Sequence, residues 1–128
     1  MRVLLLLLGC VSVMACSCIS KVEPGAVKID ANIQHVVLLW LVAPSDEAIN
    51  ALIQNTYTLA DIPQVQSLHV GSALKSTRPV VDSSYHVGIT LSFKSQEDLA
   101  SYVGHPIHQH YVETHIKGKL AKMVVYDF

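Results

Sequence analysis

A short polar stretch near residue 105 holds the side chains of this chain that are best suited to chemistry. His105-Pro106-Ile107-His108 places two imidazoles around a proline, just after the phenol of Tyr102. An imidazole titrates near neutral pH and can donate, accept or bind a metal ion. Several such groups where one helix ends and another begins indicate a pocket, although they could also serve only the structure.

A metal site is the alternative interpretation of the same histidines. His105, His108, His110 and His115 include spacings that allow neighbouring imidazoles to share a zinc ion. However, Pro106 interrupts the helix between the first two, and no cysteine or carboxylate other than Glu113 stands at a ligand-like offset. The sequence therefore predicts no metal site and no cofactor.

The elements that position these side chains can be predicted from hydrophobic periodicity and helix caps. Residues 35–42 form a strand that is apolar on both faces, and residues 85–93 alternate with Val87, Ile89, Leu91 and Phe93 inward. Ser45 and Ser95 are helix N-cap candidates, and Pro106 ends one helix and opens the next. The expected elements are strands at 35–42, 65–73, 85–93 and 121–128, and helices at 45–59, from 95, and from 106 to 118.

This order of strands and helices predicts a ferredoxin-like split βαβ domain of the α+β class, with a four-stranded antiparallel sheet. Helices cover one face of such a sheet and leave the other bare. Because the first strand, residues 35–42, is apolar on the bare face as well, that face needs a cover. A second copy related by a two-fold axis is the simplest cover, so we expect a homodimer.

The order of several motifs resembles the stress-responsive dimeric α/β-barrel (Dabb) family. The motifs are the strand from His35, then Ile62-Pro63-Gln64-Val65, Val70-Gly71, Tyr85-His86-Val87-Gly88, Phe93-Lys94-Ser95, Tyr102 with His105-Pro106-Ile107-His108, and Val125-Tyr126-Asp127-Phe128. The resemblance covers about residues 33–128. It implies a ferredoxin-like monomer whose sheet packs against that of its partner, with a small hydrophobic pocket between sheet and helices.

The resemblance also implies site residues. In the polyketide cyclases of the family, a tyrosine and the second histidine of H-P-x-H act as an acid/base pair, which corresponds here to Tyr102 and His108. A pocket histidine on the first strand corresponds to His35, whereas the matching position on the third strand holds Val87 in place of a histidine. His105 is expected to cap a helix beside the pocket. The expected ligand-binding residues are thus His35, Val87, Tyr102, His105 and His108, and Tyr102 and His108 are the candidate catalytic pair.

The amino terminus resembles an export signal. Met1-Arg2 is charged, residues 3–14 are nearly all apolar, and Val13-Met14-Ala15-Cys16 resembles a bacterial lipobox. We therefore expect a signal peptide at 1–15, a lipid on Cys16, a tether over 16–31 and the folded domain at 32–128. A second lipobox candidate at Cys10 has too short an apolar run before it. The expected location is the cell envelope, with ordinary secretion as the alternative.

Composition limits the partners further. The net charge is -1 and no lysine or arginine cluster is present, so nucleic acid is not an expected partner. Three functions agree with the sequence. The first is an envelope-anchored dimer that binds a small apolar or aromatic molecule. The second is a cyclase-like or lyase enzyme that uses the Tyr/His pair, and the third is a structural, stress-protective dimer without a ligand.

Overall fold

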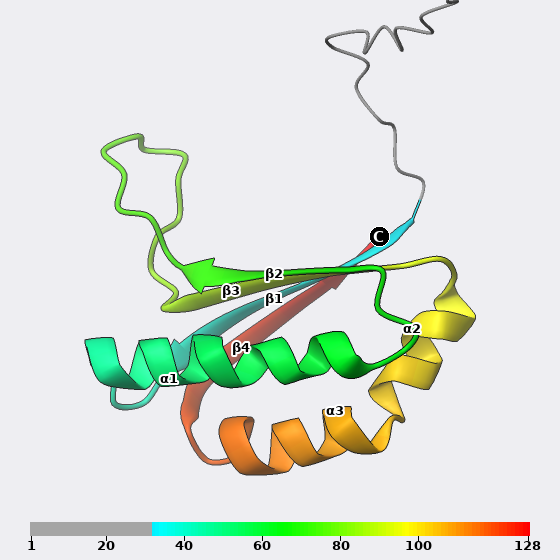
Figure 1. Ribbon diagram of the computed structural model, residues 1–128. Helices are drawn as coiled ribbons and strands as arrows, with labels where there is room; N and C mark the ends of the chain where they lie inside the picture. The colour runs from blue at the N-terminus through cyan, green and yellow to red at the C-terminus, as the bar shows by residue number, and fades with distance from the viewer. Residues whose placement is uncertain (1–31) are drawn as a thin grey trace, which may run out of the picture.

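The fold follows the order of elements that the sequence predicts. A computed structural model describes residues 32–128, so the predicted signal peptide, Cys16 and the tether lie outside the described residues. The elements, shown in Figure 1, are β1 (Ile33–Leu41), α1 (Asp46–Thr56), a 3-10 turn (Tyr57–Asp61), β2 (Ser67–Ser72), β3 (Val87–Phe93), α2 (Gln96–Val103), α3 (Pro106–Tyr111), a π-helical segment (Val112–Ile116) and β4 (Leu120–Asp127).

The sheet has four antiparallel strands in the order β2-β3-β1-β4, which is the ferredoxin-like arrangement. Strand β1 lies between β3 and β4, as expected for a strand that is apolar on both faces. All helices lie on one side of the sheet, and the long 73–86 loop between β2 and β3 rises on the other side (Figure 1). The predicted fold class is therefore confirmed.

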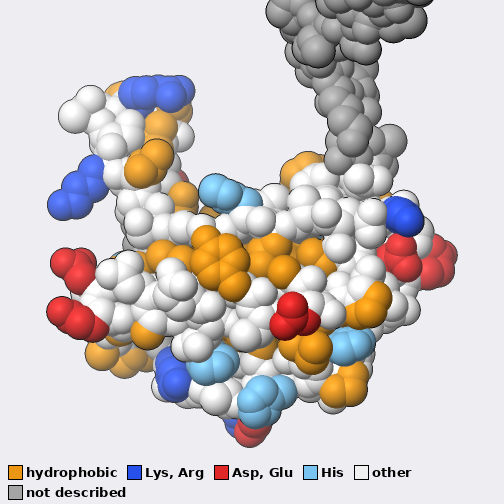
Figure 2. Space-filling view, viewed as in Figure 1, with side chains coloured by type: hydrophobic (Ala, Val, Ile, Leu, Met, Phe, Trp, Pro, Cys, Tyr) orange, Lys and Arg blue, Asp and Glu red, His pale blue; other side chains and the backbone are white. Residues whose placement is uncertain are grey.

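The core lies between the sheet and the helices, where Figure 2 shows a band of apolar side chains above α1. Period-two alternation sends every second residue of β1 and β3 into this layer. Leu39, Val87 and Phe93 have no exposed surface, and from the helices Leu52, Leu59 and Tyr102 are buried against them. The inward face predicted for 85–93 is thus the observed one.

Helix starts agree with the predicted caps, but the helix ends differ from the prediction. The Ser45 hydroxyl accepts a hydrogen bond from the Ala48 N–H, and the Ser95 hydroxyl accepts one from the Asp98 N–H. The helix predicted over 45–59 ends as an α-helix at Thr56 and tightens into a 3-10 turn. The helix predicted from Pro106 to Gly118 widens into a π-helical segment after Tyr111.

The outer face of the sheet carries apolar side chains with no cover in the monomer. Val36, Leu38 and Trp40 of β1 are each partly exposed there, next to Tyr126 of β4. The Lys122 ammonium lies 4.3 Å from the centre of the Trp40 ring, which is a cation–π contact at the edge of this face. Within residues 32–128, none of the helices is both long and apolar enough to cross a membrane.

Truncation of a core side chain tests this packing. We expect Leu39→Ala to lower the free energy of unfolding by about 2–5 kcal/mol, because a fully buried leucine leaves a cavity when it is shortened. Val42→Ala is the matched control, since Val42 follows the same strand but is 65% exposed, and should change stability by no more than about 0.5 kcal/mol. Equal losses in urea denaturation would contradict the assignment of the core face.

Candidate functional site

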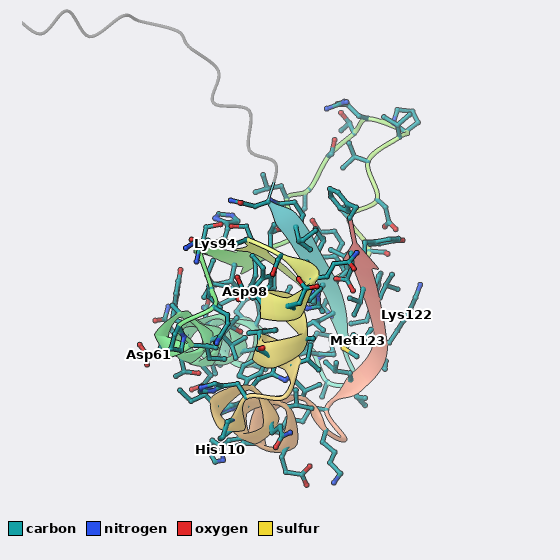
Figure 3. The ribbon with its side chains drawn as sticks, turned by 90° about the vertical axis from the view of Figure 1, so that its right-hand side faces the viewer. Asp61, Lys94, Asp98, His110, Lys122 and Met123 are labelled. Atoms are coloured by element: carbon teal, nitrogen blue, oxygen red, sulfur yellow. The ribbon has the colours of Figure 1, made fainter. Side chains whose placement is uncertain are left out.

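A cavity of about 290 Å³ lies between the sheet and the helices. It forms because the helices bury the inward residues of β1 and β3 but not those of β4. Met123 is 53% exposed and Val125 is 41% exposed, although both point to the helix side of β4. Figure 3 shows Met123 and Lys122 pointing to opposite sides of that strand. The cavity is lined by His35, Val37, Leu39, Leu59, Ile89, Leu91, Tyr102, Val103, His108, Tyr111, Val112, Ile116, Met123 and Val125.

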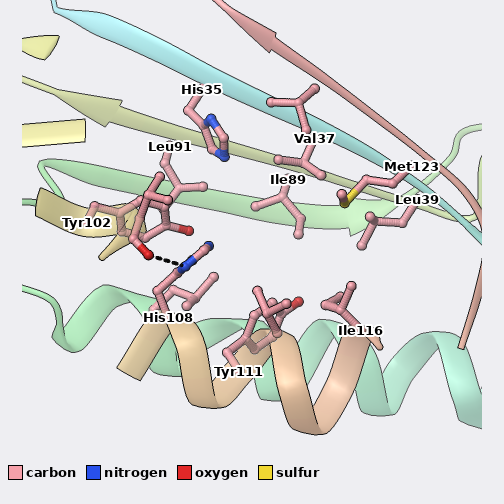
Figure 4. Close-up of a pocket in the computed structure, with 14 residues that line it drawn as sticks. His35, Val37, Leu39, Ile89, Leu91, Tyr102, His108, Tyr111, Ile116 and Met123 are labelled. Carbon is pink, nitrogen blue, oxygen red and sulfur yellow. Dashed lines mark hydrogen bonds between the residues drawn. The ribbon is translucent and has the colours of Figure 1, made fainter. Parts of the chain in front are cut away.

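Three polar side chains predicted for the pocket meet at one end of this cavity (Figure 4). His35 comes from β1, Tyr102 from α2 and His108 from α3. The Tyr102 ring centre lies 4.6 Å from that of His108 and 5.9 Å from that of His35. The structure thus brings together the three residues, although their roles in binding or catalysis stay predictions.

The orientation of His108 follows from the turn that the sequence marks with a proline. Pro106 occupies the first turn of α3, and the preceding His105 caps that helix. The His108 Nδ1 lies 3.0 Å from the Val103 carbonyl oxygen. Because a carbonyl only accepts hydrogen bonds, Nδ1 carries the proton and Nε2 keeps a free lone pair. Figure 4 shows this second nitrogen on the cavity side of the ring.

Burial favours the neutral form of His108. Desolvation is the main cause that lowers the pKa of this imidazole, and the nearby His35 lowers it further, while the hydrogen bond to Val103 opposes the shift. The ring is therefore neutral at neutral pH, and its free nitrogen can accept a proton from a ligand in the cavity.

Tyr102 is suited to donate a hydrogen bond. Its side chain is almost fully buried, and burial, assisted by the neighbouring Tyr111, raises the pKa of its phenol well above the ordinary value. The hydroxyl stays protonated at any physiological pH. Among residues 32–128 it makes no hydrogen bond to another protein group, so it is available to a ligand oxygen.

Asp127 is a site residue that the sequence analysis missed. Its carboxylate oxygen lies 2.6 Å from the Nδ1 of His35. The carboxylate only accepts, so Nδ1 of His35 donates this hydrogen bond, and Nε2 lies on the cavity side of the ring. The antiparallel pairing of the first and last strands could have revealed this contact, because His35 and Asp127 are direct partners in the register of β1 and β4.

Tyr111 also lines the cavity, but its hydroxyl is engaged elsewhere. Thr56 Oγ1 donates to the Leu52 carbonyl at 2.7 Å, so in its second contact, 2.7 Å from the Tyr111 hydroxyl, it must accept. The Tyr111 proton therefore points to Thr56 and ties α3 to α1. Tyr111 contributes the face of its ring to the cavity wall.

Two of the expected pocket residues lie elsewhere. His105 does not line the cavity, because its Nδ1 accepts the Ile107 N–H at 3.2 Å and its ring stays at the start of α3. Val87 is fully buried on the inward face of β3 but does not reach the cavity. Its strand partner Leu39 lies on the wall in its place. Neither His105 nor Val87 lines this cavity, and their contact with a ligand stays a prediction.

None of the remaining histidines lines this cavity. Figure 3 shows His110 on the outer side of α3, and His69 lies beside a groove on the opposite face of the sheet. His86 accepts the Leu41 N–H through its Nδ1 at 2.9 Å, next to a bulge in β1. In the described part of the chain, no three histidine, cysteine or acidic side chains are grouped as metal ligands.

The opposite end of the cavity is apolar. Leu39, Leu59, Ile116 and Met123 line it, and Figure 4 shows Ile116 and Met123 far from the imidazole end. The arrangement can hold a molecule that has one polar end and one apolar end. A carbonyl oxygen would accept from Tyr102, and a proton next to that carbonyl would lie near a neutral imidazole.

Solved structures share this fold. A Dabb family protein with a ferredoxin-like fold from Mesorhizobium loti has 23% identity and a TM-score of 0.63, over 76% of this chain and 94% of that one. A dimeric ferredoxin-like protein of unknown function from Thermobifida fusca has 20% identity and a TM-score of 0.63, over 76% and 89%. The hydroxynitrile lyase of Passiflora edulis has 17% identity and a TM-score of 0.66, over 76% and 91%.

These likenesses establish the fold, and the family follows from the sequence itself. No curated protein matches the chain. The sequence profile of the Stress responsive A/B Barrel Domain (Dabb) matches residues 33–128, which is the whole described domain apart from its first residue. The chain therefore belongs to the Dabb family of stress-responsive A/B barrel domains.

Proposed function

We propose that this protein binds a small apolar or aromatic molecule that carries a carbonyl or similar acceptor group. The observation that carries the proposal is the cavity itself, with its apolar wall and its three polar groups at one end. Its volume of about 290 Å³ far exceeds the ~10–15 Å³ that one water needs, and a ~150 Å³ apolar cavity already holds benzene. This volume argues against a purely structural dimer whose own side chains fill the pocket.

An enzyme of the lyase or cyclase type is the second candidate. The specific observation in its favour is the pairing of a neutral His108 with a protonated Tyr102 at the same end of the cavity. Neutral His108 would remove a proton next to a carbonyl while Tyr102 donates to the oxyanion. Because burial lowers the pKa of His108, this activity would persist at neutral pH and decline only as the pH falls through that lowered value. Val87, where the cyclases have a histidine, argues against a complete cyclase site.

The same proposal includes a homodimer formed through the outer face of the sheet. Val36, Leu38 and Trp40 expose apolar surface on that face, and a second copy would remove it from water. Proteins of similar structure that are described as dimeric support a homodimer, and the apolar outer face is the surface we propose for it. The cavity lies on the helix side of the sheet, so dimer formation through the outer face would not cover it.

We further propose that the protein is anchored to the cell envelope by a lipid on Cys16. The support is the order of charged, apolar and lipobox residues in 1–16, together with the tether before the domain. A lipoprotein anchor with several acyl chains would hold the domain stably at a membrane surface, where apolar ligands are concentrated.

Binding of a simple aryl ketone tests the cavity. We expect butyrophenone to stabilise the protein in a thermal shift assay, and Tyr102→Phe to weaken this binding roughly three- to tenfold, because one hydrogen bond is lost. Butylbenzene, which lacks the carbonyl, should bind the wild type and Tyr102→Phe equally. His110→Ala is the matched control on the outer side of α3 and should bind like the wild type. If Tyr102→Phe binds butyrophenone as tightly as the wild type does, the ligand does not bind beside Tyr102.

Sedimentation tests the dimer. The wild type should sediment as a dimer at micromolar concentration, and Leu38→Glu should convert it to a monomer, because a charge at the centre of the outer face would be buried without a partner. Asn50→Glu, on the exposed side of α1, should remain dimeric. A monomeric wild type would refute the covered-face proposal.

Metabolic labelling tests the anchor. In a bacterial host, radiolabelled palmitate should be incorporated into the wild type and into Cys18→Ser, but not into Cys16→Ser, because only the lipobox cysteine accepts the lipid. Label that persists in Cys16→Ser, or is absent from the wild type, would remove the anchor from the proposal.

A further inference from the structure

The imidazole of His35 stands between two hollows of the domain. Its ring lines the internal cavity, and its Nδ1 is bound to Asp127 at 2.6 Å. Asp127 does not line that cavity. It borders a separate depression at the surface, together with Leu99 and Phe128. One hydrogen bond thus connects the inside of the domain with its outside.

The two partners differ strongly in their exposure. The side chain of His35 is 11% exposed, whereas that of Asp127 is 50% exposed. A carboxylate that is open to solvent can exchange protons with water directly, whereas the imidazole is largely buried beside the cavity. The imidazole of this pair therefore faces the cavity, and its carboxylate faces the surface.

The surrounding backbone and rings hold this geometry. The neighbours Gln34 and Phe128 exchange two backbone hydrogen bonds, of 2.7 and 3.1 Å, which fix the end of β4 against β1. The His35 ring also makes edge contacts with Phe93 and Tyr102, with ring centres 6.4 and 5.9 Å apart. The ring is thus held on three sides, and Figure 4 shows it pointing from the sheet into the cavity.

We propose that Asp127 and His35 form a proton-transfer pair that exchanges protons between a ligand in the cavity and solvent at the end of β4. The proposal rests on the proposed function of the cavity. His35 is the group that would touch the ligand, and Asp127 is a positioning residue that acts through it. His108 has no such exit, because its Nδ1 is bound to a backbone carbonyl, which cannot take a proton.

The proposed proton transfer needs no reactant other than the ligand and water. A ligand gives a proton to Nε2 of His35, and the Nδ1 proton passes to the Asp127 carboxylate and on to water. The ring is then neutral with its proton on Nε2. In the reverse direction, Nε2 returns a proton to the ligand, and Nδ1 regains one from solvent through Asp127. The ligand exchanges or relocates one proton, and the pair returns to its starting state.

Ketonisation of benzoylacetone provides a direct test, because the enol loses an O–H proton and gains a C–H proton, and its ultraviolet absorbance reports the rate. We expect the full chain to accelerate this reaction in proportion to its concentration. Asp127→Asn should lower the protein-dependent rate by about tenfold or more, since an amide cannot take up the Nδ1 proton and does not hold the ring in the Nδ1–H tautomer. Asp127→Glu should recover most of the rate, because the exposed end of β4 leaves room for a longer carboxylate.

Nitrogen-15 NMR of the His35 ring supplies a second measurement, because it reports whether Asp127 holds the proton of the ring on Nδ1. The wild type and Asp127→Glu should show the proton on Nδ1, whereas Asp127→Asn should shift the population toward Nε2–H. Thermal melting confirms that each variant is folded.

Three results would overturn the pair: a wild type that does not accelerate ketonisation, an Asp127→Asn rate equal to that of the wild type, or an Asp127→Glu variant as slow as Asp127→Asn. Binding of butyrophenone distinguishes this failure from that of the cavity. If butyrophenone binds as proposed but Asp127→Asn catalyses ketonisation as fast as the wild type, only the proposal of a proton-transfer pair fails. If butyrophenone does not bind, the proposed function itself fails.

Discussion

Incomplete cover of the sheet by its helices is the constraint on which the rest of this structure depends. The helices bury the inward residues of β1 and β3, but Met123 and Val125 on the edge strand β4 remain partly exposed. Protein interiors normally pack without such voids, because each lost contact costs dispersion energy. Here the helices leave a void beside Met123 and Val125, and Tyr111, which also lines it, donates its hydroxyl proton to Thr56. The cavity, its apolar wall and its opening along β4 all follow from this arrangement.

Hydrogen bonds at one end of the cavity orient its polar side chains toward a ligand. His108 is bound to a backbone carbonyl and His35 to a carboxylate, so both rings carry the proton on Nδ1 and present Nε2 to the cavity. The ring of Tyr102 contacts both imidazoles, and its phenol stays protonated because it is buried. The two imidazoles differ in what lies behind them, since only the carboxylate of Asp127 can pass a proton to water. Because of Asp127, the site we propose can exchange protons with a bound carbonyl compound as well as bind it.

Local patterns predicted the fold well, whereas contacts between distant elements limited the prediction of the site. Period-two alternation identified the buried face of 85–93, and Ser45 and Ser95 were recognised as caps because the signal lies within one turn. The helix predicted over 45–59 ends at Thr56 and the helix predicted from Pro106 changes to a π-helical segment after Tyr111, and hydrophobic periodicity does not contain the hydrogen bond that joins these two residues. Local patterns do not point to Asp127, because its partner His35 lies at the other end of the domain sequence, and they do not show that Val87 is buried away from the cavity.

The central claim is that the space beside β4 is a binding site, and Met123 reports on it directly. It is the sole methionine among the described residues and lies in the wall of the cavity. A titration of carbon-13 methyl-labelled protein with butyrophenone, with the signal assigned through Met123→Leu, measures contact at this position. The account predicts that the Met123 methyl resonance shifts and saturates with the same affinity as the thermal stabilisation. A methyl resonance that stays unchanged while butyrophenone stabilises the protein would contradict it.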